Sequence, residues 1–396
     1  MKERNLKRLC PVCGESQGEI LTHVHMVLGD GIKIPNQYNV VCCENCGFTF
    51  ADANANQDVY NEYYASDNCY SCEGDIKALE KNISIAYMRD FLLKHVKKDE
   101  NILDIGCGSG DLLKALKEAG YMKLTGMDPS QESVNRLLEA SINGIRRNIF
   151  DVVDDNVAKY STIVSTCVME HIWDLNMFVD RALQYMAPNG KFYIVVPAVE
   201  GFKKYYQAKP NYFNHEHINY FSKMSLKNLM LKHNMSSMTM NNGEYYCVAD
   251  DHGNQDLMIQ NIFEANTEKK EEIEYDFASK ESIKQYIDMN NEVEKKIDAF
   301  IEKAENEKRR IVVWGAGSLA MSLMVNDKFA KYVDGFIDNN ITKTGKNIMK
   351  KEVFAPEVLK EDKFKNHLIF VACMRSSDSI LRQIDDMGIS NEVIVY

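Results

Sequence analysis

The central part of the chain alternates short apolar runs with stretches in which apolar residues recur every three or four positions. The apolar runs predict strands, and the stretches with helical periodicity predict helices between them. The predicted strands cover residues 102–105, 124–127, 162–165 and 192–196, and the predicted helices cover residues 76–95, 112–118, 132–140 and 177–186. This alternation is typical of a parallel sheet flanked by helices, in which ligands bind beyond the carboxyl ends of the strands.

The last part of the chain repeats this pattern. An apolar run at residues 311–314 leads into the turn Gly315-Ala316-Gly317, and further apolar runs follow at residues 333–337 and 368–373. These features predict a second, C-terminal Rossmann-like α/β domain. Its glycine turn alone is a weak indicator of a nicotinamide cofactor, and a nucleotide-sugar or scaffold role fits it equally well. The charged segment before it has apolar residues on one side, which predicts a helical connector.

The first part of the chain contains two pairs of cysteines with the spacing C-x-x-C. The first pair is Cys10 and Cys13, and the second is Cys43 and Cys46. Four thiolates at this spacing suit a tetrahedral, structural zinc ion. Redox-active or simply buried cysteine pairs are the alternative, and the adjacent Cys42 is a second choice for the position of Cys43.

Residues 59–70 are rich in tyrosine and show no clean period. We expect an ordered loop that covers a ligand, with ordinary surface packing of tyrosines as the alternative. The predicted domains are a zinc-binding domain with this loop (1–75), a central α/β domain (76–245), the helical connector (246–307) and the C-terminal α/β domain (308–396).

Length and composition narrow the possible functions. With 396 residues the chain is long enough for two or three domains, and its 45% hydrophobic and 27% charged residues indicate a soluble globular protein. The formal net charge of -11 argues against broad binding to nucleic acids or anionic membranes. No apolar run is long enough for a transmembrane helix, and no export signal is evident. With 11 cysteines, these features predict a cytoplasmic protein in which metal binding is favoured over disulfides.

The most informative stretch is Asp104-Ile105-Gly106-Cys107-Gly108-Ser109-Gly110, at the end of the first predicted strand of the central domain. Glycines are needed here because the turn is tight and the backbone must come close to a ligand. The second predicted strand ends about twenty residues later in Asp128, a carboxylate placed to accept hydrogen bonds from ribose hydroxyl groups. No G-x-x-x-x-G-K-[ST] loop is present, so a nucleoside triphosphate is not the expected ligand.

With these residues the central domain resembles the class I S-adenosylmethionine (SAM) methyltransferases, whose glycine loop also follows an acidic strand end. The passage from Glu170-His171 to Pro188-Asn189-Gly190 is similar to the E-H-x-x-D and L-x-P-G-G segments common in that superfamily. The resemblance implies a Rossmann-like methyltransferase core that binds SAM. The residues then expected to contact the cofactor are Asp104, Gly106, Cys107, Gly108, Gly110, Asp128, Pro129, Phe150 and Cys167.

The order of the parts resembles that of the bacterial deoxysugar C-methyltransferase family, which acts on nucleotide-linked keto sugars. Residues 212–222 read Y-F-N-H-E-H-I-N-Y-F-S, similar to the family motif Y-H-E-H-x-x-Y-F-S. In that family the acid and the second histidine of the motif lie at the sugar, and a histidine is the base. The resemblance places Glu216 and His217 beside the reacting carbon, and it adds His171 and Tyr64 to the sugar pocket.

Methylation at carbon requires the removal of a proton next to a carbonyl group. His217, held by Glu216, is the predicted base because histidine titrates near neutral pH. His215 or a nearby tyrosine would stabilise the enolate oxygen. A polar turn with solvated histidines is the alternative, and a zinc site at the H-x-H pair would need further ligands that are not evident locally.

The sequence thus predicts a SAM-dependent methyltransferase with a structural Zn²⁺ ion and a small-molecule substrate, preferably a nucleotide-activated sugar methylated at carbon. Methylation at oxygen or nitrogen of a sugar or another small metabolite is the alternative within enzymes. A non-catalytic, zinc-stabilised scaffold that binds nucleotide is the alternative of another class. Neither nucleic acid nor membrane is expected as a partner.

Overall fold

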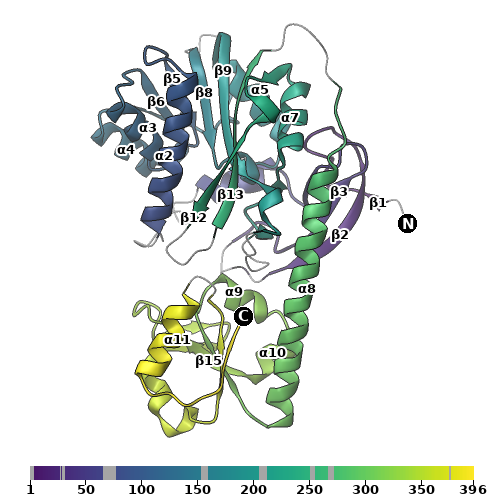
Figure 1. The fold of residues 1–396 in the computed structure, drawn as a ribbon, viewed down its shortest axis with the longest axis vertical. Coiled ribbons are helices and arrows are strands. Elements are labelled where there is room, and N and C mark those ends of the chain that lie inside the picture. Colours follow the sequence, from purple (N-terminus) through teal and green to yellow (C-terminus); the bar gives the residue numbers. More distant parts are fainter. Residues whose placement is uncertain are drawn as a thin grey trace. The chain divides into compact units, whose positions relative to one another are not determined.

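The computed structural model describes residues 4–26, 28, 32–65, 77–152, 159–204, 212–249, 255–265, 272–373 and 376–396. The chain divides into two compact units, both visible in Figure 1. The first unit comprises Met1–His23, Gly31–Tyr205 and His215–Lys284, and the second comprises Val24–Asp30, Tyr206–Asn214 and Gln285–Tyr396. Among the described residues, no helix is both long and apolar enough to cross a membrane.

The centre of the first unit is an eight-stranded sheet with the order β11-β13-β9-β8-β5-β6-β7, in which β12 pairs with β13. Its strands are β5 (Ile102–Ile105), β6 (Leu124–Asp128), β7 (Asn143–Arg146), β8 (Tyr160–Thr166), β9 (Met186–Pro197), β11 (Met235–Ser237), β12 (Glu244–Ala249) and β13 (Gln255–Ala265). Strands β5 to β9 are parallel, whereas β13 is antiparallel to β9. The predicted parallel sheet is therefore present, with an antiparallel extension that the sequence did not predict.

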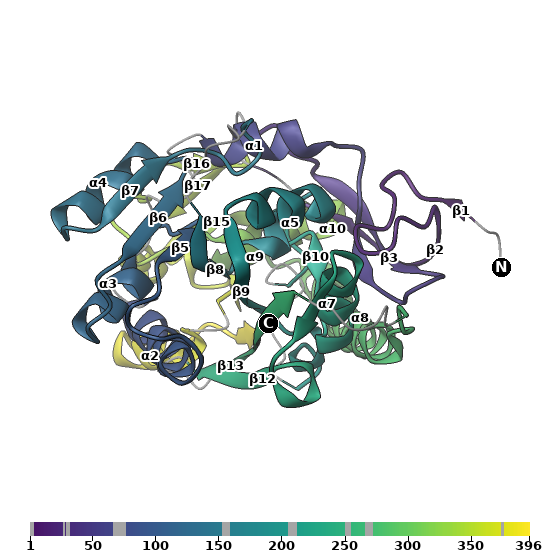
Figure 2. The ribbon, with the colours of Figure 1, turned by 90° about the horizontal axis from the view of Figure 1, so that it is seen from above.

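Two helical layers cover this sheet. The helices are α2 (Lys77–His95), α3 (Asp111–Glu118) and α4 (Gln131–Glu139) in one layer, and α5 (Leu175–Gln184) and α7 (Lys223–Lys232) in the other. Alternate strand residues face alternate layers, because successive side chains of a strand point to opposite faces. Ile102 and Val164 thus pack with the α2–α4 layer, and Leu103 and Ile163 pack with the α5 and α7 layer. Figure 2 shows the two layers on either side of the strands.

A smaller, five-stranded sheet in the same unit has the order β1-β2-β3-β4-β10. Its strands are β1 (Arg4–Asn5), β2 (Gln17–His25), β3 (Gln37–Cys43), β4 (Thr49–Asp52) and β10 (Asn219–Tyr220). The last strand comes from a distant part of the chain, and its Asn219 lies opposite Phe50 of β4. The cysteine-containing segment therefore shares a sheet with the residues that directly follow His217.

Two expectations for this unit are wrong. The tyrosine-rich segment begins as helix α1 (Gln57–Ala65) rather than as a loop, while residues 66–70 lie outside the described part of the chain. The first part of the predicted helical connector instead forms strands β12 and β13. Ile259 and Ile262 of β13 are both fully buried although they pack in the two cores on opposite faces of the sheet, so the sequence of this strand lacks the alternation of a half-exposed strand. The rest of the connector does contain a long helix, α8 (Phe277–Asn306).

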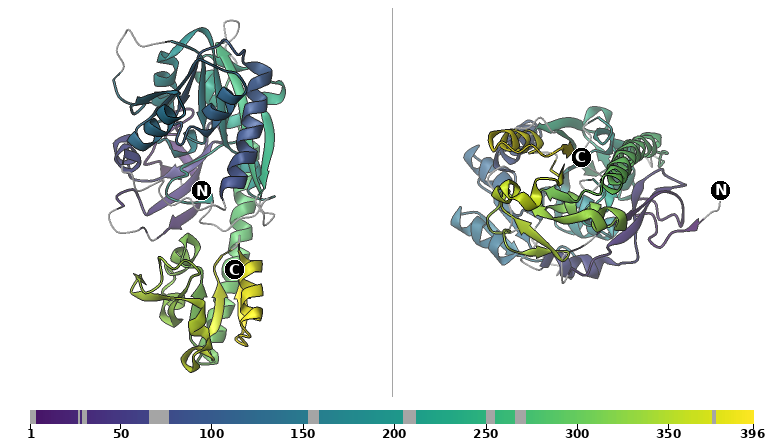
Figure 3. Two further views of the ribbon diagram at one scale, coloured as in Figure 1. Left: turned by 90° about the vertical axis from the view of Figure 1, so that its left-hand side faces the viewer. Right: turned by 90° about the horizontal axis from the view of Figure 1, so that it is seen from below.

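The second unit contains a six-stranded sheet with the order β16-β17-β15-β14-β18-β19, parallel except for β16. Its elements are β14 (Ile311–Trp314), α9 (Ser318–Leu323), α10 (Asp327–Tyr332), β15 (Val333–Ile337), β16 (Asn347–Ile348), β17 (Lys351–Phe354), β18 (Leu368–Val371), α11 (Ser377–Asp386) and β19 (Val393–Val395). Trp314 packs with Ile380 of α11 on one face, and Val313 packs with Phe300 of α8 on the other. Figure 3 shows α11 against this sheet from two further directions.

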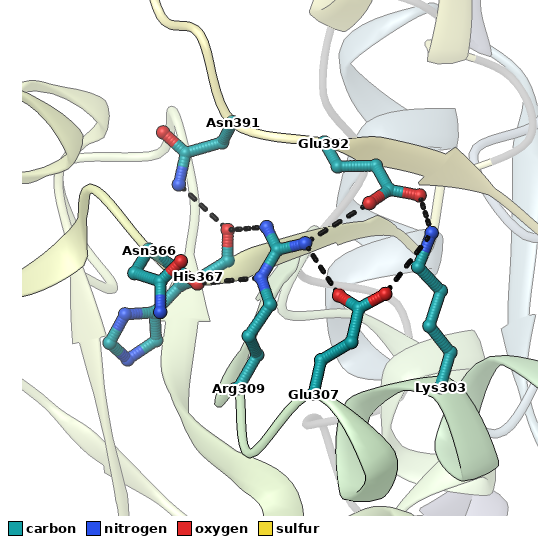
Figure 4. Close-up of polar contacts among 7 residues, drawn as sticks. All are labelled: Lys303, Glu307, Arg309, Asn366, His367, Asn391 and Glu392. Atoms are coloured by element: carbon teal, nitrogen blue, oxygen red, sulfur yellow. Dashed lines mark hydrogen bonds and ion pairs between the residues drawn. The ribbon is translucent and has the colours of Figure 1, made fainter.

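Charged side chains join the end of α8 to the edge of this second sheet (Figure 4). The Nζ atom of Lys303 lies 2.5 Å from Oε1 of Glu392, and a guanidinium nitrogen of Arg309 lies 3.1 Å from Oε2 of the same carboxylate. Arg309 also donates from Nε to the main-chain carbonyl of Asn366 at 2.9 Å. Because the ion pairs are partly exposed, each adds only about 0–1 kcal/mol.

Short 3-10 helices complete the fold. They are η1 (Met169–His171), η2 (Val199–Gly201), η3 (Met240–Asn242), η4 (Pro356–Lys360) and η5 (Asp362–Phe364). The first of them directly follows β8 and carries His171 to the carboxyl edge of the central sheet, where ligands bind in parallel sheets.

Candidate active site and cysteine cluster

The glycine loop between β5 and α3 is held against the end of β6. The amide of Gly106 donates to the carbonyl oxygen of Met127 at 2.8 Å. Gly106, Gly108 and Gly110 have φ values of 75°, 51° and 72°, a left-handed conformation that favours glycine. A Cβ atom on Gly110 would lie 2.3 Å from Cδ2 of Leu137, so this position also needs glycine for close packing.

The two acidic strand ends differ in their surroundings. Both carboxylate oxygens of Asp128 accept main-chain amides, Oδ2 from Gly108 at 3.0 Å and Oδ1 from Ser130 at 2.9 Å. Asp104 is buried, and its Oδ1 has no hydrogen-bond partner among the described residues. Burial, with a contribution from the charge of Asp128, raises the pKa of Asp104 to about 7. Asp128 therefore closes the glycine loop onto β6, while Asp104 is a core carboxyl group that is partly protonated near neutral pH.

A cavity of 340 Å³ lies at the carboxyl ends of β5, β6 and β8. This volume is in the range of small-molecule and cofactor sites. The residues predicted to contact the cofactor that line this cavity are Gly106, Cys107, Gly108, Asp128, Pro129, Phe150 and Cys167. Asp104 and Gly110 do not line it, because Asp104 lies in the core behind the loop and Gly110 packs against Leu137.

Helix α1 forms one wall of the cavity, in the tyrosine-rich segment that the sequence predicted as a loop covering a ligand. Gln57, Asn61 and Tyr64 recur at helical spacing and all line the cavity. The buried Tyr60 stacks on Trp173 with ring centroids 5.7 Å apart, which anchors the helix. In the sequence this helix is marked by polar residues three and four positions apart rather than by an apolar period. Further lining residues, which the sequence did not predict, are Ser130, Glu132, Ser133, Arg136, Arg147, Ile172 and Phe178.

Histidines and tyrosines gather at the end of the cavity next to α1. The hydroxyl group of Tyr64 lies 2.9 Å from Nδ1 of His171, and this nitrogen is 3.2 Å from the main-chain carbonyl oxygen of Glu216. The ring of His217 stands edge-on to that of His171, with centroids 4.8 Å apart. Tyr64 and His171 line the cavity, and His217 is next to them.

The carboxylate of Glu216 is paired on the side of this cluster formed by α1. Its Oε1 accepts a hydrogen bond from the hydroxyl group of Tyr63 at 2.6 Å and lies 4.0 Å from Nε2 of His215. The structure therefore brings all five residues of the predicted catalytic set into one cluster, and it adds Tyr63. The base role predicted for His217, held by Glu216, stays a prediction.

The two histidines at the cavity are uncharged near neutral pH. Burial lowers the pKa of His171 to about 4 and that of His217 to about 3, so both imidazoles are neutral. Burial also raises the pKa of the neighbouring Glu170 to about 8, and its Oε2 has no hydrogen-bond partner in the part of the chain described. Sequence reasoning did not single out Glu170 as a titrating group.

Glu170, His171 and His217 offer one possible metal-ligand set, with ligand atoms within 4.8 Å of one another. A tetrahedral ion with N and O ligands at about 2.1 Å would draw such atoms to about 3.4 Å from each other. Nε2 of His171 lies 3.9 Å from Oε1 of Glu170, somewhat wider than this. We therefore assign no metal to this set.

The four cysteines of the two C-x-x-C pairs fit a metal much better. The Sγ atoms of Cys10 and Cys46 are 3.6 Å apart, and those of Cys13 and Cys43 are 3.4 Å apart. A tetrahedral ion with Zn–S bonds of about 2.3 Å would hold sulfur atoms about 3.8 Å from each other. The neighbouring Cys42 is outside this cluster, so the structure selects Cys43 as the fourth member.

Glycines follow both cysteine pairs, as a sulfur-wrapping turn requires. The amide of Gly14 donates to the carbonyl of Cys10 at 2.8 Å, and the amide of Gly47 donates to that of Cys43 at 3.1 Å. Both glycines have positive φ, and a Cβ atom on Gly47 would lie 2.5 Å from the main-chain oxygen of Asp276. The second turn is therefore packed directly against the segment before α8.

Comparison with known proteins identifies the central part of the chain. A family described as "Methyltransferase domain" matches residues 82–236, and a family described as "C2185-like, N-terminal" matches residues 307–395. The mitochondrial ubiquinone biosynthesis O-methyltransferase of Bos taurus is 27% identical over 130 residues, which cover 28% of this chain and 35% of that protein. The ubiquinone biosynthesis O-methyltransferase of Chelativorans sp. is 25% identical over 126 residues, covering 28% and 49%. The chain thus spans about a third to a half of the length of these curated relatives.

Two solved structures are similar to part of the chain. The 1,6-didemethyltoxoflavin-N1-methyltransferase of Burkholderia thailandensis has a TM-score of 0.42 and 14% identity, covering 56% of this chain and 96% of that one. A SAM-dependent methyltransferase of Methanosarcina mazei has a TM-score of 0.36 and 17% identity, covering 45% and 98%. The matched family, together with the glycine loop, Asp128 and the cavity, shows that residues 82–236 form a class I SAM-dependent methyltransferase domain.

Proposed function

We propose that this protein transfers the methyl group of SAM to an oxygen atom of a small-molecule acceptor. The observation that carries this proposal is the cavity bordered by the glycine loop and Asp128 at one end and by the Tyr64–His171 pair at the other. The O-methyltransferase names of the matched relatives support oxygen as the acceptor atom.

The chemistry requires alignment of the acceptor and removal of its proton, because the sulfonium group of SAM is already electrophilic. We assign the acceptor side to His171, which lines the cavity, with His217 and Tyr64 beside it. A neutral imidazole has a lone pair for the acceptor proton, but the low pKa of both histidines makes them weak bases. This favours an acceptor whose hydroxyl group is itself acidic, such as a phenol or an enol.

A second candidate is C-methylation of a nucleotide-linked keto sugar. It is supported by the position of His215, Glu216 and His217 beside the cavity. In the sugar methyltransferases that residues 212–222 resemble, the corresponding motif lies at the sugar. In this reaction His217 would take the proton from carbon, and Tyr63 or His215 would face the enolate oxygen.

We also propose that Cys10, Cys13, Cys43 and Cys46 bind a structural zinc ion. The spacing of their sulfur atoms and the turns at Gly14 and Gly47 support this assignment. With four protein ligands, such an ion has no open position for catalysis.

The experiment incubates the full chain with SAM carrying a ¹³C-labelled methyl group and two acceptor panels, one of phenolic and enolic metabolites and one of nucleotide-linked keto sugars. Mass spectrometry detects the methylated product, and ¹³C NMR separates a methyl group on oxygen from one on carbon. Methylated phenols or enols are expected. Methylation of the sugar panel at carbon would replace the first proposal with the second, and failure of the wild type to bind S-adenosylhomocysteine would refute both.

The cofactor end of the cavity is tested by Asp128→Asn. This change removes the negative charge that the amides of Gly108 and Ser130 and the cofactor ribose would share. We expect the affinity for S-adenosylhomocysteine to fall by about tenfold or more, since hydrogen bonds to a charged group are stronger than neutral ones. Isothermal titration calorimetry measures this. Asp111→Asn, in the first turn of α3 but outside the cavity lining, is the matched control and should bind normally.

A further inference from the structure

We propose that Arg8 is a positioning residue that holds both histidine segments of the acceptor site in place and ties them to the cysteine-containing sheet. Arg8 lies two residues before Cys10, far in sequence from the methyltransferase domain. The term acceptor site rests on the proposed function, whereas the contacts themselves do not.

The guanidinium group of Arg8 connects two segments that are distant in sequence. It donates to the main-chain carbonyl of Ile172 at 3.1 Å and to that of Trp173, and it donates to the carbonyl of Ile218 at 3.3 Å. It also donates to Oδ1 of Asn219 at 3.0 Å. The side chain is only 4% exposed, so water does not compete for these contacts.

Two of these carbonyl groups belong to the residues that directly follow the two histidines. Ile172 follows His171, and Ile218 follows His217, so fixing their peptide groups restricts the backbone that orients each imidazole. The two segments are also joined to each other, because the amide of Ile218 donates to the carbonyl of Glu170 at 2.9 Å. Arg8 adds the link from this pair of segments to the N-terminal sheet.

The guanidinium group is itself held in a fixed orientation. The amides of Lys7 and Arg8 both donate to Oδ1 of the buried Asp52, at 2.7 and 2.8 Å. The Cζ atom of Arg8 lies 4.5 Å from the centroid of the Trp173 ring and 5.6 Å from that of Phe50. A planar, stacked fork of donors can serve several carbonyl groups at once, which the single ammonium group of lysine cannot do.

The arrangement gives the cysteine-containing segment a role in the acceptor site. Arg8 lies between β1 and β2 of the sheet whose edge strand β10 begins two residues after His217. A change at Arg8 should therefore disturb His171 and His217 without touching the glycine loop at the cofactor end of the cavity.

The test uses the zinc-containing full chain and the variant Arg8→Lys, which keeps the charge but not the fork. Deuterium exchange at the C2 hydrogen of each histidine, read by mass spectrometry, reports on the surroundings of His171 and His217, with His367 of the second unit as an internal reference. We expect exchange at both to accelerate by about tenfold, since charge-assisted hydrogen bonds are among the strong ones. Calorimetry should show unchanged affinity for S-adenosylhomocysteine, and the methyl-transfer assay should show a lower kcat with an unchanged KM for SAM.

Two further variants separate positioning from general stability. Val40→Ala opens a cavity in β3 of the same sheet without removing a contact of Arg8, so it should lower Tm but leave both histidines unchanged. Asp52→Asn loosens only the main chain at Arg8 and should accelerate exchange at both histidines less than Arg8→Lys does. If Arg8→Lys does not fold, Asp52→Asn carries the test. Unchanged exchange at His171 and His217 in the folded variants, or equal acceleration in Val40→Ala, would overturn the inference, even if the wild type binds S-adenosylhomocysteine.

Discussion

At the scale of single residues, the core beside the cavity contains two buried, poorly partnered carboxyl groups. Asp104 and Glu170 are both buried, and each has one oxygen without a hydrogen-bond partner among the described residues. Burial raises the pKa of both, to about 7 and about 8. In the folded protein both carboxyl groups have a lower free energy when protonated than when ionised, since an unpaired buried charge is costly. The pKa values of both carboxyl groups therefore lie near the physiological pH range.

This titration predicts a pH-dependent stability that Glu170→Gln should remove. The folded pKa lies above the ordinary value for glutamate, so the stabilising contribution of this group is complete below the unfolded pKa and is lost as pH rises through about 8. The wild type should therefore lose a few kcal/mol relative to the variant between about pH 5 and about pH 9. Urea unfolding across this range measures the difference. Parallel curves for wild type and Glu170→Gln would contradict the assignment.

At the scale of secondary structure, the cavity depends on two elements of different kinds. The glycine loop has its conformation encoded locally, in glycines with positive φ. Helix α1 forms the opposite wall, and its position depends on contacts such as the stacking of Tyr60 on Trp173. The first kind of element is visible in a sequence, whereas the second depends on residues that are distant along the chain.

The loop offers a matched pair of substitutions. Alanine at Gly108, with φ of 51° and nothing within 4 Å of the added Cβ, should cost only the backbone strain of about 1–2 kcal/mol. Alanine at Gly110, where the Cβ would lie 2.3 Å from buried Leu137, should cost about 1–3 kcal/mol more, because the core must also be overpacked. Chemical denaturation without ligand measures both. Equal destabilisation would show that packing behind the loop is unimportant.

At the scale of the whole molecule, the cysteine cluster lies in the same hydrophobic core as helices α5 and α7 and the central strands. The cysteine-containing segment is thus part of the first unit and shares its hydrophobic core. Loss of a metal there should lower the free energy of unfolding of the whole unit, because the free energy of metal binding contributes to folding.

This can be tested with Cys10→Ser and its matched control Cys42→Ser. Elemental analysis should find one zinc ion per chain in the wild type and in Cys42→Ser, whose Sγ contacts Tyr275 rather than the cluster. Cys10→Ser should bind less than one equivalent and have a clearly lower Tm, since three ligands hold zinc more weakly than four. A wild type without zinc, or zinc loss in Cys42→Ser alone, would contradict the assignment.

The sequence by itself determined the features that depend on local chemistry. The glycine loop, the acidic end of β6, the parallel strands and the C-x-x-C pairs each need particular residues at short spacing, so they can be recognised without a fold. Most of the predicted cofactor contacts line the cavity for this reason.

Only the tertiary structure decided which distant segments meet. It placed Tyr63 beside Glu216, put β10 in the cysteine-containing sheet and brought Arg8 to the carbonyl groups after both histidines. It also turned residues 244–249 and 255–265 into strands of the central sheet. These contacts join residues more than a hundred positions apart or bury strands on both faces. Neither situation leaves a periodic pattern, because the partner that satisfies each group is not nearby in the sequence.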